Sequence, residues 1–150
     1  MGRRTILLVD DDRDYVDIVE RAMEHEQLQA DVTIARSGPE ALEKLGLTQS
    51  KTDRARPEYA ALFVDLNLPG LDGWEILRRV RADVELRQLP VVVVSSSARI
   101  TDVNRSYDMG ANSYVVKRYD PRGPGRYLAQ AMQYWLDLNR AATVAARKAL

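Results

Sequence analysis

Five polar side chains directly follow short apolar runs, at positions where buried strands are expected to end. Three are carboxylates, one is a hydroxyl and one is an ammonium. Clustered carboxylates raise one another's pKa unless a cation neutralises them, and one ammonium cannot offset three negative charges. A hard divalent ion such as Mg²⁺ can do so, because it prefers oxygen ligands and takes one or two carboxylates with several waters. The five residues are Asp10, Asp11, Asp65, Ser95 and Lys117.

Asp65 is the residue best placed for chemistry. It ends an apolar run and precedes Pro69 and Gly70, which force the backbone to turn. An uninterrupted apolar run is typical of a strand buried on both faces of a parallel sheet, and open α/β sheets bind ligands at the carboxyl ends of such strands. Beside a divalent ion and Lys117, Asp65 could attack phosphorus and form an acyl phosphate. The metal, the ammonium and the Ser95 hydroxyl would stabilise the transferring oxygens.

The elements that position these residues alternate along the chain. Strand-like apolar runs and helically spaced apolar residues alternate five times, which predicts a parallel sheet covered on both faces. The polar stretch 46–58 predicts an exposed connection, and the last amphipathic helix is expected to continue past the domain into 139–150. The expected strands are 6–9, 32–35, 59–65, 91–94 and 114–116, and the expected helices cover 15–23, 38–45, 73–80, 101–109 and 121 onward.

Composition excludes several classes of function. The length of 150 residues predicts one domain, and 22 basic against 22 acidic residues give a formal net charge of zero. That balance predicts binding neither to nucleic acid nor to a membrane surface. The chain has no cysteine, so disulfides and thiolate chemistry are excluded. No run has the length of a membrane span or a secretory signal, so a cytoplasmic location is expected, and the solitary His25 is expected at the surface.

The motifs at these strand ends resemble those of receiver domains of two-component response regulators, the CheY-like fold. The resemblance extends over residues 5–139. It implies a single-domain, flavodoxin-like, doubly wound α/β fold with a five-stranded parallel sheet in the order 2-1-3-4-5, five helices and an extended C-terminal helix. Residues 140–150 would be a helical extension or tail. The matching motifs are at 8–11, 64–73, 94–96 and 114–117.

The resemblance also implies a role for each residue of the site. Asp65 would accept a phosphoryl group from the phosphohistidine of a histidine kinase, and Lys117 would contact that group. Ser95 would be the hydroxyl that moves toward it, and the rotamer of Tyr114 would report the change. Such a chain is a phosphoacceptor rather than an enzyme. The implied Mg²⁺ ligands are Asp10, Asp11, Asp65 and the backbone carbonyl of Asn67.

Within this family, the spacing is similar to that of stand-alone regulators paired with phytochrome-type kinases. The shared features are the long polar connection before Tyr59, the segment 106–108 and the Tyr-Trp-Leu at 134–136. One departure is Arg118, which stands where the family usually has a proline, often after a cis bond. A cis bond before a non-proline residue costs about 2.5–4 kcal/mol, so a trans bond and a differently placed 117–126 loop are expected.

Other functions fit parts of the pattern. A phosphatase of the haloacid dehalogenase type needs a second acid two residues after the nucleophile, where this chain has Asn67. An FMN carrier needs a phosphate loop after the first strand, where this chain has three carboxylates. A receiver-like scaffold that is not phosphorylated, or a phosphate sink, stays open. A homodimer, formed through the fourth helix and fifth strand or through the C-terminal helix, is a hypothesis drawn from Tyr134, Trp135 and the apolar tail.

Overall fold

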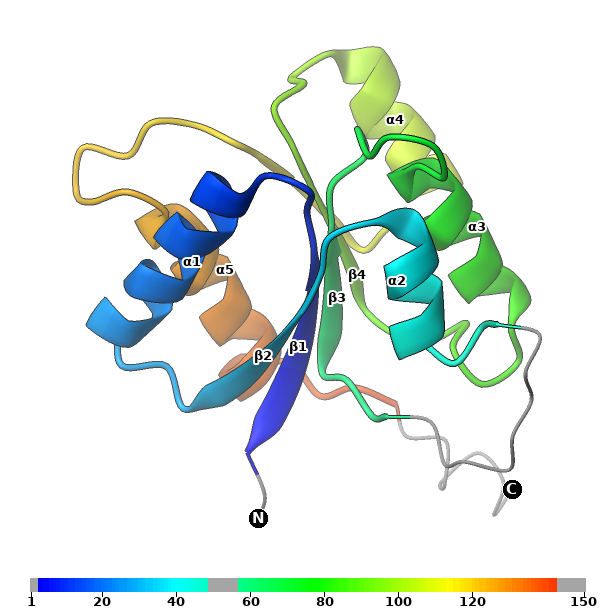
Figure 1. Cartoon of the computed structure of the whole chain (residues 1–150), viewed down its shortest axis with the longest axis horizontal. Helices are drawn as coiled ribbons and strands as arrows, with labels where there is room; N and C mark the ends of the chain where they lie inside the picture. The colour runs from blue at the N-terminus through cyan, green and yellow to red at the C-terminus, as the bar shows by residue number, and fades with distance from the viewer. Residues whose placement is uncertain (1–2, 49–56, 143–150) are drawn as a thin grey trace.

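A computed structural model describes residues 3–48 and 57–142 and contains one parallel sheet (Figure 1). The strand order is β2-β1-β3-β4-β5, and every neighbouring pair is parallel. This order confirms the predicted fold class. No strand boundary differs from the prediction by more than two residues, and the central strand is shorter than predicted, starting two residues late and ending one residue early. The strands are β1 (Arg4–Val9), β2 (Ala30–Ala35), β3 (Ala61–Val64), β4 (Val91–Ser95) and β5 (Ser113–Val116).

Helices cover both faces of the sheet. In Figure 1, α1 and α5 lie on one side of the strands, and α2, α3 and α4 lie on the other. Within the described ranges, no helix combines the length and apolar character needed to cross a bilayer. The helices are α1 (Arg13–His25), α2 (Gly38–Lys44), α3 (Gly73–Ala82), α4 (Ile100–Asp108) and α5 (Arg126–Gln133), followed by one π-helical turn, η1 (Tyr134–Leu138).

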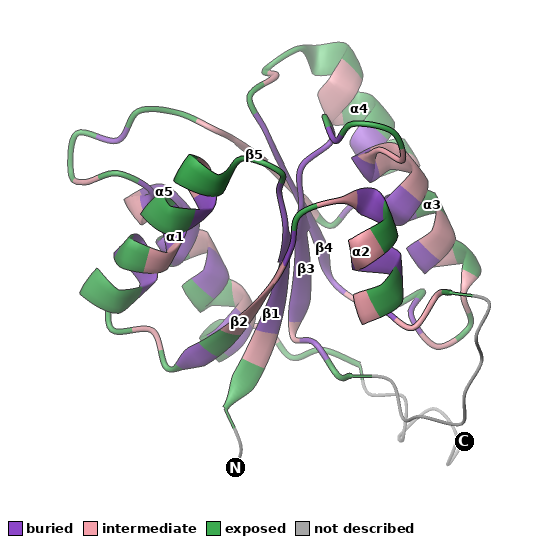
Figure 2. Ribbon diagram, viewed as in Figure 1, coloured by how far each residue is buried: buried purple, intermediate pink, exposed green. Residues whose placement is uncertain are grey.

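The two layers of helices explain why β3 is apolar throughout and why β4 is apolar as far as Val94. Every residue of β3 and β4 is buried (Figure 2). In β1, Leu7 and Val9 pack with the core on the α2–α3 side, whereas Ile6 and Leu8 pack with α1 and α5. Successive residues of a strand point to opposite faces, so a strand between two helical layers has no polar position. The first polar residue after such a strand therefore lies at the edge of the sheet.

The predicted starts of α2 and α3 are confirmed by side-chain caps. Ser37 accepts the N–H of Glu40 at the start of α2, and Asp72 accepts the N–H of Glu75 at the start of α3. Each bond satisfies a backbone donor that the first helical turn leaves unpaired. Gly110, with φ at 101°, lies just after the end of α4, which falls one residue before the predicted helix end at 109.

The C-terminal helix is shorter than predicted. It begins at Arg126 rather than near residue 121, because Gly123 and Gly125 have φ values of 150° and 73°, which an α-helix cannot accommodate. It ends at Leu138, and Asn139 has extended backbone. The Arg4 guanidinium donates to the Leu136 carbonyl, the acceptor that a further helical turn would use. The predicted helical continuation is thus wrong for 139–142, and residues 143–150 lie outside the described ranges.

Candidate functional site

Asp10 and Asp65 follow neighbouring strands, β1 and β3, whose last residues are register partners. Their exposed fractions are 1% and 7%. Each carboxylate accepts a backbone N–H from two residues further along, Asp12 to Asp10 at 2.9 Å and Asn67 to Asp65 at 3.1 Å. These bonds hold both carboxylates at the same edge of the sheet. The parallel register therefore brings together two acids that are far apart in sequence.

Lys117 lies between these two carboxylates. Its Nζ is 2.7 Å from Asp10 Oδ2 and 3.0 Å from Asp65 Oδ2. Burial by itself would lower the pKa of Lys117, but the hydrogen bonds to the two acids outweigh it and the pKa is raised. Burial raises the pKa of Asp10, since the bonds from Lys117 and the Asp12 N–H offset only part of the desolvation. The ammonium stays charged, and the buried acid needs further positive charge.

The third predicted acid joins the same cluster. Asp10, Asp11 and Asp65 each offer a carboxylate oxygen, and these oxygens lie within 4.8 Å of one another. Asp11 is exposed, so the cluster opens to solvent on one side. Three carboxylates against one ammonium leave a formal charge of two negatives, and all the donors are hard oxygens. This donor set fits a divalent cation of the Mg²⁺ or Mn²⁺ type.

Ser95 and Tyr114 meet at the loop between β4 and α4. Ser95 is fully buried, and its Oγ accepts the N–H of Ser97 at 3.1 Å. The Tyr114 hydroxyl donates to the Ser97 carbonyl at 2.8 Å. The Ser97 hydroxyl in turn donates to Asp102 Oδ2 at 2.6 Å, which lowers the pKa of that carboxyl. Strand β4, strand β5 and the first turn of α4 are thus joined through one serine.

Two tyrosines that the sequence did not single out complete the site. The Lys117 ammonium lies 4.2 Å from the centre of the Tyr15 ring. The Tyr15 hydroxyl is 3.0 Å from the Tyr127 hydroxyl, which accepts the Arg118 N–H at 3.3 Å. Helical spacing predicts only that both tyrosines lie on the apolar faces of their helices. It does not show which residue of another element an aromatic ring contacts. The positive charge at Lys117 is the signal that could have drawn attention to them.

Two minor predictions are confirmed. Within residues 3–48 and 57–142 the backbone has no cis peptide bond, so the bond between Lys117 and Arg118 is trans as expected. The side chain of His25 is 83% exposed, which agrees with a surface position.

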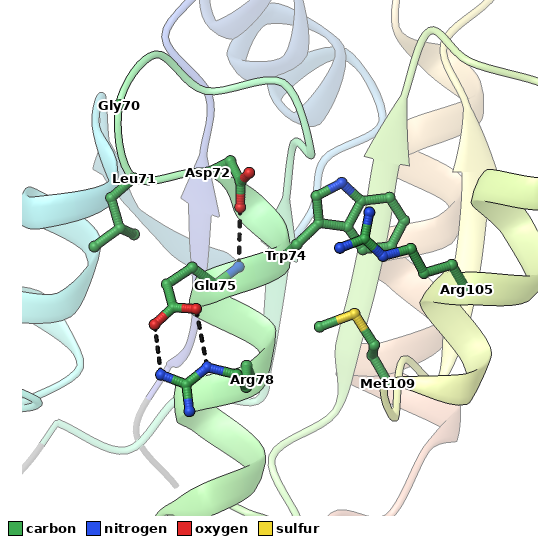
Figure 3. A pocket seen from close by; sticks show the side chains of 8 residues that line it. All are labelled: Gly70, Leu71, Asp72, Trp74, Glu75, Arg78, Arg105 and Met109. Atoms are coloured by element: carbon green, nitrogen blue, oxygen red, sulfur yellow. Dashed lines mark hydrogen bonds and ion pairs between the residues drawn. The ribbon is translucent and has the colours of Figure 1, made fainter.

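A separate hollow of about 350 Å³ lies between α3 and α4 (Figure 3). Within it, the Arg105 guanidinium lies 4.2 Å from the centre of the Trp74 ring, and Glu75 pairs with Arg78. No residue of the predicted site lines the hollow, whose lining is Gly70, Leu71, Asp72, Trp74, Glu75, Arg78, Arg105 and Met109.

A doubly wound sheet with three acids and a lysine at its carboxyl edge is the arrangement that receiver domains share. The family model for the response regulator receiver domain matches residues 6–123. The chain therefore belongs to the response regulator receiver domain family, whose members signal through phosphorylation and are phosphoacceptors rather than enzymes of the ordinary kind. This confirms the resemblance seen in the sequence.

Its relatives include regulators of similar length. Probable methanogenesis regulatory protein FilR2 of Methanothrix harundinacea is 33% identical over 136 residues, which are 91% of this chain and 86% of that protein. Response regulator Rcp1 of Synechocystis sp. is 28% identical over 134 residues, 89% of this chain and 90% of that protein.

Solved structures agree with this placement. The phosphorylated cyanobacterial phytochrome response regulator RcpA superposes with a TM-score of 0.81 at 27% identity, covering 95% of this chain and 100% of that one. The Mn²⁺-bound form of Rcp1 gives a TM-score of 0.78 at 27% identity, covering 93% and 99%. The likeness to stand-alone phytochrome response regulators is thus confirmed in three dimensions.

Proposed function

We propose that this chain accepts a phosphoryl group on Asp65 from the phosphohistidine of a histidine kinase, in a reaction that needs Mg²⁺. The observation that carries the proposal is the Lys117 ammonium, which lies 3.0 Å from the Asp65 carboxylate inside a cluster of three acids. The Asp65 oxygen attacks phosphorus, the phosphorus–nitrogen bond to the kinase histidine breaks, and the imidazole leaves with the electron pair. Family membership supports this direction of transfer.

The side chains of the site divide the work. Lys117 offers positive charge to a phosphoryl oxygen, and the Ser95 hydroxyl can donate a hydrogen bond to another. Asp10, Asp11, Asp65 and the backbone carbonyl of Asn67 would hold the divalent ion. When bound, that ion neutralises charge on the phosphoryl oxygens as the bond to phosphorus forms. The Mn²⁺-bound form of Rcp1 supports a metal at such a site in a relative of this chain.

The loop after β4 is the proposed switch. A phosphoryl oxygen on Asp65 would draw the Ser95 hydroxyl toward it. The Ser97 N–H would then lose the acceptor that it now has at 3.1 Å. Since the Tyr114 hydroxyl bonds to the same residue's carbonyl, Tyr114 and the first turn of α4 would respond to the change. The surface formed by α4 and β5 is therefore the proposed output.

Partners are proposed from the relatives. RcpA is a cyanobacterial phytochrome response regulator, which favours a phytochrome-type histidine kinase as the phosphodonor.

A homodimer is also proposed through η1, where Tyr134 and Leu138 are exposed. Sedimentation with and without an acyl phosphate mimic tests the dimer, and a monomer in both conditions would contradict it.

Incubation with acetyl phosphate and Mg²⁺ tests the phosphoacceptor directly. Intact mass spectrometry should show one added phosphoryl group that is stable in acid and released in base. The adduct should be absent from Asp65→Asn and from wild type in EDTA. An adduct that persists in Asp65→Asn would place the acceptor elsewhere. If wild type forms no adduct, the unphosphorylated scaffold is favoured. If a kinase phosphorylates Asp65 but the surface of α4 and β5 does not change, the phosphate sink is favoured.

A further inference from the structure

The Lys117 ammonium contacts two carboxylates and the face of an aromatic ring. The ring belongs to Tyr15, whose centre lies 4.2 Å from Nζ. Tyr15 stands in the first turn of α1, where its N–H bonds to Asp12 Oδ1 at 3.2 Å. The N–H of Asp12 bonds in turn to Asp10. Two successive hydrogen bonds from backbone N–H groups to carboxylates thus fix the start of α1, which carries the ring, relative to the acid that the lysine contacts.

The far end of the ring is anchored as well. The Tyr15 hydroxyl lies 3.0 Å from that of Tyr127 in α5, a residue that is itself buried. The Tyr127 hydroxyl also accepts the N–H of Arg118 at 3.3 Å. A proline at position 118 would have no N–H to donate. The residue that departs from the family pattern therefore supplies the bond that completes this anchor.

We propose that Tyr15 is a positioning residue for Lys117, its ring held by Tyr127 and its face holding the ammonium against Asp10 and Asp65. The face of an aromatic ring is electron-rich and attracts a cation within about 6 Å. A lysine side chain has many rotamers, and a ring that excludes most of them lowers the conformational entropy that Lys117 must lose when it contacts the phosphoryl group. The proposal rests on the proposed phosphoacceptor function.

Three variants distinguish the effect of the ring face from the effects of the hydroxyl and of apolar volume. Tyr15→Phe keeps the ring and loses the hydroxyl. Tyr15→Leu keeps apolar bulk and loses the ring. Tyr127→Phe keeps both rings and removes the anchor. Tyr107→Leu, a half-exposed tyrosine on α4, is the matched control.

The first measurement needs neither metal nor phosphodonor. The chain has four lysines, so the ε-methylene signals of protein carrying ¹³C-lysine can be resolved and the Lys117 signal assigned by its loss in Lys117→Met. In wild type and Tyr15→Phe, the ring should displace the Lys117 signal from the random-coil position. In Tyr15→Leu it should return toward that position. An undisplaced wild-type signal, or one unchanged in the leucine variant, would overturn the proposal.

The second measurement is the rate of Asp65 phosphorylation by acetyl phosphate at fixed Mg²⁺. Tyr15→Leu should be slower by about three- to ten-fold, from the usual strength of a partly desolvated cation–π contact. Tyr15→Phe should retain at least about half the rate, and Tyr107→Leu the full rate. A phenylalanine variant as slow as the leucine one, or a slowed control, would contradict the role of the ring face.

Tyr127→Phe removes the same hydroxyl contact as Tyr15→Phe, so the two variants should give similar Lys117 signals and rates, and a Tyr127→Phe as slow as Tyr15→Leu would contradict the role of the ring face. Two outcomes need separate treatment. If circular dichroism shows that Tyr15→Leu is unfolded, Tyr15→Met, which also keeps apolar bulk without a ring, decides: a Lys117 signal and a rate identical to wild type would contradict the proposal. If wild-type protein takes no phosphoryl group, the proposed function fails. The lysine signals still show in that case whether the ring holds the ammonium.

Discussion

Replacing Asp10 by asparagine should make the stability of the protein far less sensitive to Mg²⁺. Without metal the variant should be about as stable as wild type, because opposing effects are lost together. The attraction between Lys117 and Asp10 at 2.7 Å is about 6 kcal/mol for an effective dielectric constant of about 20. Two effects oppose that attraction. Asp65, whose carboxylate oxygen lies within 4.8 Å, repels Asp10 by at least about 3.5 kcal/mol on the same scale, and burial raises the pKa of Asp10.

With metal, the two proteins should separate. A cation present at 100 times its dissociation constant stabilises the folded state by about 2.7 kcal/mol. For a chain of this size, that corresponds to a rise in Tm of roughly 5–10 °C. Loss of one charged ligand costs about 1.5–3 kcal/mol of binding, so the same Mg²⁺ concentration should stabilise Asp10→Asn by at most about 1.4 kcal/mol. The variant's Tm should therefore rise about half as far or less.

Thermal unfolding followed by circular dichroism, in EDTA and in MgCl₂, measures both quantities. Asp17→Asn is the control, because Asp17 is an exposed acid of α1 and its loss should leave the full Mg²⁺ effect. If Asp10→Asn gained as many degrees from Mg²⁺ as wild type, Asp10 would not be part of the metal site. If the control lost the effect as well, the stabilisation would come from general charge screening.

Three further changes test how the fold supports the site. A methyl group on Gly73 would lie 2.2 Å from the carbonyl oxygen of Asp65, so Gly73→Ala should lower the free energy of unfolding by about 1–3 kcal/mol in urea; an unchanged midpoint would contradict this. Arg81→Ala should lower the free energy of unfolding by about 2–4 kcal/mol, because the guanidinium donates to three backbone carbonyls and to the Asn112 side-chain oxygen. The exposed control, Arg78→Ala, should lower it by less than about 1 kcal/mol, and equal losses in the two variants would contradict this prediction. The pKa of Asp120 is lowered to about 2 by its arginine partner, so its stabilisation is present above pH 4 and is lost as pH falls toward 2; Asp120→Asn should flatten acid unfolding in that window, and an unaltered acid transition would count against the ion pair.

The sheet and the acidic cluster could be predicted because parallel strands leave few alternatives. Once the apolar runs are taken as strands, their carboxyl ends must share one edge, and the first polar residue after each run must lie there. Asp10, Asp65 and Lys117 are brought together by that rule, although they come from three different strands. The caps at Ser37 and Asp72 were predictable for a local reason, since each side chain bonds to a backbone N–H three residues along.

Contacts between helices were beyond the same reasoning. Tyr15 and Tyr127 are 112 residues apart and come from α1 and α5, which pack side by side on one face of the sheet. Arg81 reaches the Gly110 carbonyl and the Asn112 side chain across the end of α3. Apolar periodicity shows which face of a helix is buried but not which residue it meets. Contacts of this kind depend on how separate elements are placed in three dimensions, which no local sequence pattern specifies.

The C-terminal helix shows how a periodic pattern can be extended too far. Trp135, Leu136 and Leu138 continue the apolar spacing of α5, which is why a long helix was expected. A π turn has more residues per turn than an α-helix, so it changes the direction of the side chains that follow. Leu136 remains buried while Leu138 is 75% exposed. Residues 140–142 are exposed, and short helices that do not pack on a core are marginal in water. Tyr134 and Leu138 are therefore left exposed at the end of this helix, where the proposed second copy of the chain would cover them.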